Sequence, residues 1–162
     1  MSENLIQMSL YYWLQYSKNH RFITPNSCNI FPWEVDLLSV TRAGYFHEFE
    51  IKITLADFKA DSRKQRKHQK LKLGTQHIPK YFWYVIYGFE LQAEDVPGHA
   101  GLIEIAPNKS CWYLGYPRVL KEAPKLNGRK ITEKEKERLC QSAYYRFWRE
   151  NETRLKNVHS VC

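Results

Sequence analysis

Polar and apolar residues alternate along residues 34–54, which is the pattern of β-strands that place one face in a hydrophobic core. We expect one strand at about 34–41 and a second at about 45–54, joined by a hairpin turn at Gly44. The apolar residues of the second strand fall on one face, and the opposite face carries a run of charged residues. Acidic residues are poor strand formers, and a buried charge is costly unless it is paired or bound to a metal. The charged face is therefore the first candidate for a functional site.

The other segments alternate between helical and strand patterns. Apolar residues at helical spacing predict a first helix over residues 5–19, and helix-forming composition predicts another over residues 55–74. Segments rich in aromatic and β-branched residues predict further strands at 22–24, 80–88, 100–106 and 111–116. Thr132 and Glu135 form a capping box that opens a C-terminal helix over residues 132–155. This order of elements predicts an α/β fold with a mixed β-sheet flanked by helices.

Length and composition narrow the class of protein. The 162 residues suit a single domain, residues 1–162, and a hydrophobic content of 43% excludes a disordered tail. We expect no membrane association, because no apolar run approaches the roughly 20 residues of a membrane span. The start of the chain lacks signal-peptide features and the four cysteines form no C-x-x-C pair, so we expect reduced thiols and a cytoplasmic protein. The net charge of +8 favours a nucleic-acid partner, although a basic surface that only aids solubility explains it equally well.

The charged strand faces carry two carboxylates and a lysine that could converge. Asp36 lies on the first strand, and Glu50 and Lys52 lie on the second. In an antiparallel hairpin, opposed side chains have Cβ atoms about 5 Å apart, so Asp36 and Glu50 could share one metal ion. Mg²⁺ prefers oxygen ligands from one or two carboxylates, completed by water and substrate phosphate. With a lysine beside the ion to act on a water molecule, the arrangement suits phosphodiester hydrolysis.

The same residues resemble a known family. Asp36, followed fourteen residues later by Glu50-Ile51-Lys52 in the next strand and then by a helix, resembles the PD-(D/E)XK nuclease superfamily. The flanking stretches PWEVD and EFEIK are most similar to small phage or bacterial members near the MmcB-like DNA-repair group, and the resemblance covers about residues 31–73. It implies a restriction-endonuclease-like αβββαβ core, to which the later strands and the C-terminal helix are additions.

The resemblance also implies an activity and a division of roles. Asp36, Glu50 and the backbone carbonyl of Ile51 would bind Mg²⁺, for which Mn²⁺ could substitute, and Lys52 would serve the attacking water. The implied protein is a metal-dependent deoxyribonuclease that hydrolyses phosphodiester bonds. It would act in DNA repair, recombination or phage DNA metabolism, in the cytoplasm of a bacterium or a phage-infected cell.

The chain departs from the family pattern in its acidic residues and its proline. The proline of the motif name is Pro32, which is not adjacent to Asp36. Some members carry a glutamate inside the first helix, whereas here the nearby acidic residue, Glu3, precedes the predicted helix. Glu34 shares a face with Asp36 and is a candidate replacement ligand. Glu48 has no counterpart in the basic motif.

The predicted helix after the lysine strand carries further candidates. Lys64 and His68 fall on one stripe with Asp57 and Asp61, and by the resemblance either could face the scissile phosphate. The stripe could equally be a ladder of ion pairs three and four residues apart. The remaining cations of this helix would contact a nucleic-acid backbone without reading its sequence: Arg63, Arg66, Lys67, Lys70 and Lys72.

Other functions stay open. A nuclease fold could serve as a catalytically silent subunit that binds DNA or joins a complex, and another α/β fold could pair these carboxylates with lysines on a solvent face. An RNase could use the same residues, since nothing in the sequence recognises or excludes the 2′-hydroxyl. The sequence has no feature that indicates a homodimer interface, and it does not exclude one.

Overall fold

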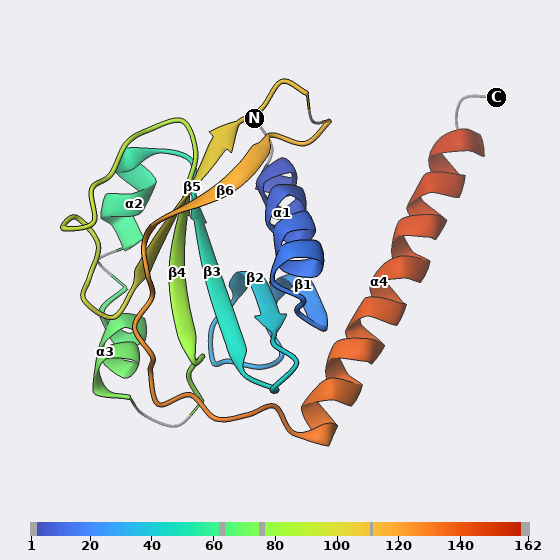
Figure 1. The fold of residues 1–162 in the computed structure, drawn as a ribbon. Coiled ribbons are helices and arrows are strands. Elements are labelled where there is room, and N and C mark those ends of the chain that lie inside the picture. Colours follow the sequence, from blue (N-terminus) through green and yellow to red (C-terminus); the bar gives the residue numbers. More distant parts are fainter. Residues whose placement is uncertain (1–2, 62–63, 75–76, 111, 160–162) are drawn as a thin grey trace. The chain divides into compact units, whose positions relative to one another are not determined.

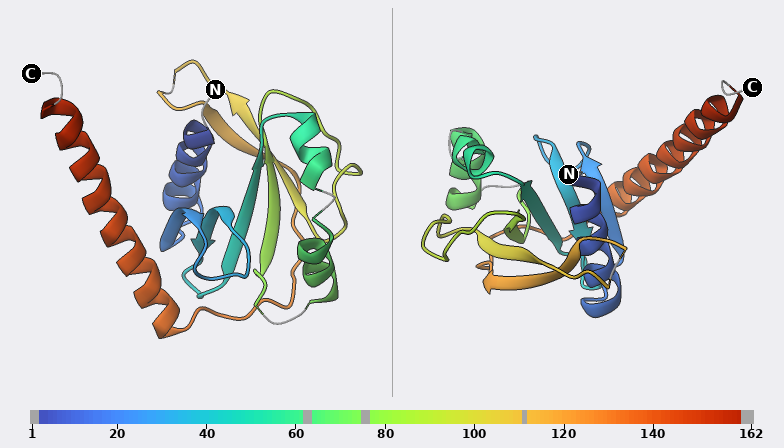
Figure 2. Two further views of the ribbon diagram at one scale, coloured as in Figure 1. Left: turned by 180° about the vertical axis from the view of Figure 1, so that it is seen from behind. Right: turned by 90° about the horizontal axis from the view of Figure 1, so that it is seen from above.

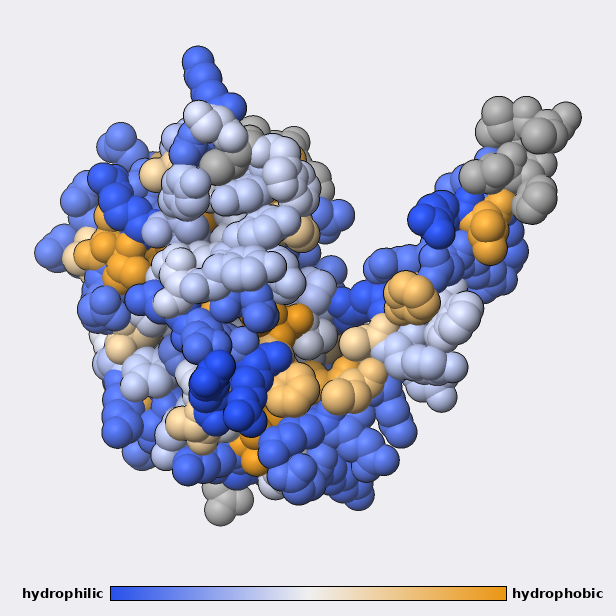
Figure 3. Space-filling view, turned by 45° about the vertical axis from the view of Figure 1, so that its right-hand side comes forward, coloured by the Kyte–Doolittle hydropathy of each residue, from blue (hydrophilic) through white to orange (hydrophobic). Residues whose placement is uncertain are grey.

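The computed structural model of the protein describes residues 3–61, 64–74, 77–110 and 112–159 (Figure 1). The chain divides into two compact units, residues 1–131 and residues 132–162. The first unit is an α/β body and the second is one helix. Within the described residues, no helix combines the length and apolar character that a membrane crossing requires. Most side chains on view in Figure 3 are hydrophilic, as expected for a chain in which 26% of residues are charged.

The first unit contains a six-stranded mixed sheet in which the strands lie side by side in chain order. The first three strands are antiparallel, the fourth is parallel to the third, the fifth is parallel to the fourth, and the sixth is antiparallel to the fifth. The expected mixed sheet with flanking helices is therefore confirmed. The strands are β1 (Phe22–Ser27), β2 (Val35–Val40), β3 (Phe46–Lys52), β4 (Tyr81–Ile86), β5 (Gly101–Pro107) and β6 (Gly115–Lys121).

Helices cover both faces of this sheet. α1 (Glu3–Tyr12) and the π-helical turn η1 (Trp13–Ser17) lie on one face, and α2 (Leu55–Asp61) and α3 (Gln65–Leu73) lie on the other (Figure 2). α2 and α3 form the crossover between β3 and β4, because parallel neighbours require a long connection. The central strands are consequently buried on both sides, and this position explains the continuous apolar run of β4.

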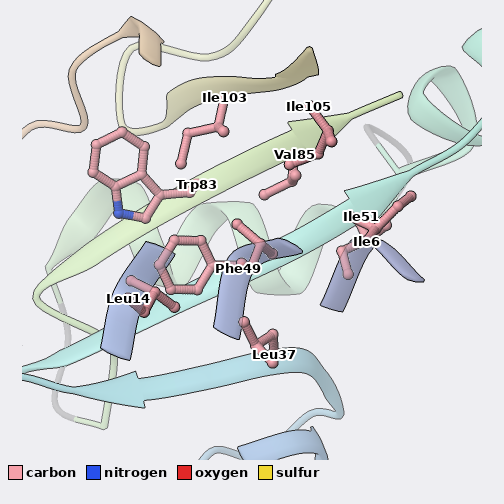
Figure 4. Packing of buried hydrophobic residues seen from close by; sticks show 10 residues of the cluster. Ile6, Leu14, Leu37, Phe49, Ile51, Trp83, Val85, Ile103 and Ile105 are labelled. Carbon is pink, nitrogen blue, oxygen red and sulfur yellow. The ribbon is translucent and has the colours of Figure 1, made fainter. Parts of the chain in front are cut away.

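Two hydrophobic clusters form the core, one on each face of the sheet. Ile6 and Leu14 pack on the first face with Phe49 and Ile51 of β3 (Figure 4). The second cluster joins Leu71 of α3 to residues of β4 and of the segment before β5, among them Phe82, Tyr84, Leu91 and Ala100. Alternation along β3 therefore places its apolar residues against α1 and its charged residues on the side of α3.

Several predicted boundaries differ from the structure. The hairpin turn lies where expected, and Gly44 adopts a left-handed φ of 87°. The last strand was expected at 111–116, but β6 begins at Gly115 and continues to Lys121. Cys111 lies outside the described residues. This edge strand alternates between partly buried and exposed residues, and an edge tolerates Pro117 because an outward-facing N–H needs no partner.

The expected helix over 55–74 is two helices. α2 ends at Asp61 and α3 begins at Gln65, since Lys64 has a non-helical ψ of 57°. Gly74 ends α3 in the left-handed conformation, as predicted. This break changes which side chains of α3 face the sheet. Cys28 and Cys140 are free thiols, and Cys111 and Cys162 lie outside the described residues.

The second unit consists of α4 (Glu133–His159). The predicted capping box is present at its start. The Thr132 backbone N–H donates to Glu135 Oε2 at 2.9 Å, and the Glu135 N–H donates to Thr132 Oγ1 at 3.3 Å. Two N–H groups that lack a helical partner are satisfied in this way.

Candidate active site

The β2–β3 hairpin places Asp36 beside Glu50. Leu37 pairs with Phe49, and continuing this register by one residue places Asp36 opposite Glu50. Asp36 Oδ2 accepts a hydrogen bond from the Ile51 backbone N–H at 2.7 Å, so its carboxyl group lies against β3. Burial and the negative charge of Glu50 raise the pKa of Asp36 to about 7, although the bond from Ile51 lowers it. The two carboxyl groups are therefore close enough to repel each other.

Three lysine side chains surround Glu50. Lys52 Nζ lies 2.9 Å and Lys64 Nζ 3.1 Å from Glu50 Oε1, and Lys67 Nζ lies 2.5 Å from Oε2. Burial alone would raise the pKa of Glu50, but the charges of Lys67 and Lys52 outweigh it and hold that pKa below its ordinary value. The side chain of Lys64 is 55% exposed, whereas those of Lys52 and Lys67 are at most 6% exposed. Lys64 is thus the most accessible of the three.

Glu48, for which the motif offers no role, neutralises a buried lysine. It is fully buried, and its Oε1 lies 2.6 Å from Lys67 Nζ. The indole N–H of Trp33 donates to both Glu48 oxygens, at 3.0 and 3.1 Å. Burial raises the pKa of Glu48, and Lys67 counteracts this increase. Glu48 therefore holds the ammonium of Lys67 between itself and Glu50.

The expected exposure of Lys67 is wrong. The sequence places Lys67 among the cations that would contact a nucleic-acid backbone. Its side chain is only 6% exposed, however, and lies against Glu48 and Glu50. The physical reason is that two buried carboxylates require a counter-charge, and the break before α3 turns Lys67 toward them. Arg66, Lys70 and Lys72 are exposed, as expected, and Arg63 lies outside the described residues.

Asp61 forms a second buried cluster beside Lys52. Its Oδ2 accepts a hydrogen bond from the Tyr84 hydroxyl at 2.5 Å and lies 3.0 Å from His68 Nε2. Its Oδ1 receives no hydrogen bond within the described residues, and its ion-pair partners are Lys64 Nζ at 2.9 Å and Lys52 Nζ at 3.6 Å. Burial raises the pKa of Asp61, but the hydrogen bonds of His68 and Tyr84 and the charged lysines lower it overall. Asp61 thus connects the helices to the lysine strand.

His68 belongs to this second cluster. Its Nε2 faces Asp61 and Tyr84, and its Nδ1 lies 3.1 Å from His99 Nε2. The structure therefore groups Lys64, but not His68, with the contacts of Glu50. The sequence placed Asp61 only in an ion-pair ladder. Its burial depends on the position of Tyr84, which is distant in sequence.

Two further acidic residues flank Asp36. Glu34 is exposed on the loop before β2. Glu3 was expected to precede the first helix, but α1 begins at Glu3, which accepts a hydrogen bond from Gln7 at 3.0 Å. Burial and the charge of Glu50 raise the pKa of Glu3, and Glu34 adds to this effect. Glu3 therefore lies within the electrostatic influence of the carboxylate pair.

The expected metal ion needs oxygen ligands from this cluster. Within the described residues, no group of three His, Cys, Asp or Glu side chains is arranged to hold a metal. The ligands expected from the sequence are only two side chains, the carboxylates of Asp36 and Glu50, together with the backbone carbonyl of Ile51. A divalent cation would remove the repulsion that raises the pKa of Asp36. The oxygen chemistry of this donor set suits one Mg²⁺, with water or phosphate as further ligands, but the ion would compete with Lys52, Lys64 and Lys67 for the Glu50 oxygens.

A cavity of about 690 Å³ lies beside the charge cluster. Its walls come from the loop before β2 and from α3, including Lys64 at its N-cap. Its lining includes the ring of Trp33, the carboxylate of Glu34 and four cationic side chains: Lys64, Arg66, Lys67 and Lys70. The cavity therefore combines apolar surface with several positive charges.

No protein-family model and no curated protein matches the sequence. Among solved structures, the SPO1766 protein of unknown function from Silicibacter pomeroyi is similar, with a TM-score of 0.57 and 17% sequence identity. The similarity covers 91% of this chain and 86% of that chain. At this identity it shows a shared fold and carries no information on activity.

Proposed function

We propose that the protein is a metal-dependent nuclease of the PD-(D/E)XK type that hydrolyses DNA phosphodiester bonds. The observation that carries the proposal is the convergence of Asp36 and Glu50, from adjacent strands, beside the buried Lys52. Burial and the charge of Glu50 raise the pKa of Asp36, a bound cation would offset that repulsion, and perturbed carboxyl groups of this kind concentrate at functional sites. The element order from α1 to β4 agrees with the αβββαβ core of that superfamily.

The side chains suggest a role for each group. Asp36, Glu50 and the Ile51 carbonyl would hold Mg²⁺, which when bound lowers the pKa of water and stabilises charge on phosphate. Lys52 is held at the end of β3 by Glu50 and Asp61, at 2.9 and 3.6 Å. From there its ammonium can orient the attacking water and neutralise charge that develops on the phosphate.

The cations of α3 support a polyanionic substrate. Arg66, Lys70 and Lys72 are exposed on the helix that supplies Lys67 to the cluster, and the chain carries a net charge of +8. Such side chains contact backbone phosphates without reading sequence. With DNA as substrate, the enzyme would act in repair, recombination or phage DNA metabolism in a bacterial or phage-infected cytoplasm.

A second candidate function is a catalytically silent subunit that binds DNA. The observation that favours it is the saturation of Glu50 by three ammonium groups, which a metal ion must partly displace. In that function the cluster is an ion-paired core, and binding requires no metal. RNA cleavage by the same residues is the other alternative, and comparison of DNA with RNA substrates distinguishes it.

A cleavage assay distinguishes these functions. The protein is incubated with linear, nicked, branched and single-stranded DNA and with RNA, in Mg²⁺, Mn²⁺ or EDTA, beside Asp36→Asn and Lys52→Ala. Glu104→Gln, which alters a partly exposed carboxylate of β5 outside the cluster, is the matched control. We expect metal-dependent DNA cleavage by the wild type and the control, and loss in both site variants. DNA binding without cleavage in any metal would instead support the silent subunit.

A further inference from the structure

The cavity between the loop before β2 and α3 is not explained by catalysis alone. Its volume, about 690 Å³, falls in the range of sites that enclose small organic ligands. Lys64 and Lys67 line this cavity and also contact Glu50, so the cavity adjoins the carboxylate pair. A ligand in the cavity would therefore lie next to the proposed reaction centre.

Trp33 gives this cavity a fixed aromatic wall. Its indole N–H is held by both oxygens of Glu48, and its ring stacks on Phe31 with a centroid distance of 5.7 Å. The ammonium groups of Lys67 and Lys70 lie 5.8 and 5.9 Å from the indole centroid. A rigid ring beside several cations matches a ligand that combines a flat aromatic group with a phosphate. A phosphate alone would need only the lysines.

We propose that this cavity binds one unpaired nucleotide of the DNA substrate, adjacent to the phosphate that is cut. The identity of the ligand as DNA rests on the proposed nuclease function. The base would contact Trp33, and its phosphate would contact Lys64 and Lys70. Inside a duplex both faces of a base are covered by its neighbours, and a terminal base is still tied to its pairing partner, so only an unpaired base can enter the cavity and stack on the indole. The preferred substrates are therefore overhangs, flaps, gaps and single strands rather than blunt duplexes.

Binding of fluorescein-labelled DNA in EDTA tests this proposal without hydrolysis. Three probes share one duplex: a blunt form, a form with one unpaired terminal nucleotide, and a form whose overhanging residue is abasic. Fluorescence anisotropy gives their dissociation constants. Because base–aromatic stacking favours binding by about 5- to 150-fold, we expect the overhang to bind about tenfold more tightly than the abasic form, and the blunt form to bind no more tightly than the abasic form. Tighter binding of an RNA overhang than of the DNA overhang would overturn DNA as the ligand.

Variants identify the side chains that cause the preference for the overhang. Trp33→Leu should abolish the advantage of the overhang and leave blunt-duplex binding unchanged, whereas Trp112→Leu, which removes an exposed tryptophan elsewhere, should retain it. Lys70→Ala should weaken overhang binding several-fold more than Lys109→Ala, an exposed lysine of the β5–β6 connection. If Trp33→Leu fails to fold, Lys70→Ala decides: overhang binding that is weakened no more than by Lys109→Ala would overturn the proposal.

The proposed nucleotide site and the proposed nuclease activity can be refuted separately. Equal affinity for all three probes, together with metal-dependent cleavage, would refute the nucleotide site and leave the nuclease intact. A Trp33-dependent preference for the overhang without cleavage in any metal would support the site and refute the nuclease. A preference that survives in Trp33→Leu would place the base elsewhere.

Discussion

Removal of the positive charge of Lys67 is expected to destabilise the fold strongly. In Lys67→Met the side chain keeps its length and apolar stem, but Glu48 and Glu50 lose an ammonium group at 2.6 and 2.5 Å. Glu50 retains Lys52 and Lys64, whereas within the part of the chain that the structure describes Glu48 retains only the indole N–H of Trp33 as a hydrogen-bond donor. The cost therefore falls mainly on Glu48.

The magnitude follows from the burial of this pair. Removing one partner of a buried ion pair costs about 3–5 kcal/mol, because the other charge is left uncompensated. A domain is stable by only about 5–15 kcal/mol, so Lys67→Met should lose a large fraction of its free energy of unfolding. Glu48→Gln in the Lys67→Met background removes the uncompensated charge and should recover about half of the loss. Lys70→Met, on the exposed side of α3, should change stability by less than about 0.5 kcal/mol.

Urea denaturation followed by tryptophan fluorescence measures these differences, with pH as a second variable. Burial raises the pKa of Glu48 in the folded protein, and this increase becomes larger when Lys67 is absent. The folded variant then binds a proton that the unfolded chain releases, so its stability rises as pH falls. We expect the deficit of Lys67→Met to be smaller near about pH 5 than near about pH 8. A deficit equal to that of Lys70→Met, or a double variant no more stable than Lys67→Met, would refute this reasoning.

Three further outcomes are expected. Burial and the charge of His20 lower the pKa of His47 from 6.5 to about 3. The unfolded chain therefore binds a proton that the folded protein does not, and the folded protein should lose stability as pH falls below 6.5. Urea titrations should show a smaller loss in His47→Gln. Thr132→Ala removes the cap of α4 and should destabilise that helix by about 0.5–2 kcal/mol. Far-ultraviolet circular dichroism on heating measures this loss, and Thr132→Ser should retain the cap. Arg66→Ala and Lys72→Ala should each reduce the salt dependence of DNA binding by about one unit of slope, and an unchanged slope would exclude them from the backbone contacts.

The local elements were largely predictable from the sequence. Alternation in residues 48–54 determines which face of β3 is charged, and Gly44 supplies the left-handed turn, so the approach of Asp36 to Glu50 could be expected from the sequence. The capping box at Thr132 is a local signal for the same reason. Patterns of this kind depend on residues close together in the chain, which the sequence displays directly.

The environment of the lysines was not predictable in the same way. Whether Lys67 faces solvent or Glu48 depends on the break between α2 and α3, which composition does not reveal. Asp61 is buried because Tyr84 of β4 reaches it across the crossover. Both outcomes are set by tertiary packing, which overrides local helix propensity. An excess of buried carboxylates on one strand is the signal that would have indicated a buried lysine nearby.

Cleavage of a labelled DNA with an unpaired end, by wild type and Asp36→Asn in parallel, tests the central claim most directly. With Mg²⁺ the wild type should cleave, EDTA should abolish the reaction, and Asp36→Asn should be slower by at least about 100-fold while it binds the DNA normally in EDTA. Cleavage that persists in EDTA or at the wild-type rate in Asp36→Asn would contradict a metal-dependent site at Asp36 and Glu50. The absence of cleavage by a folded, DNA-binding wild type in either Mg²⁺ or Mn²⁺ would contradict the nuclease itself.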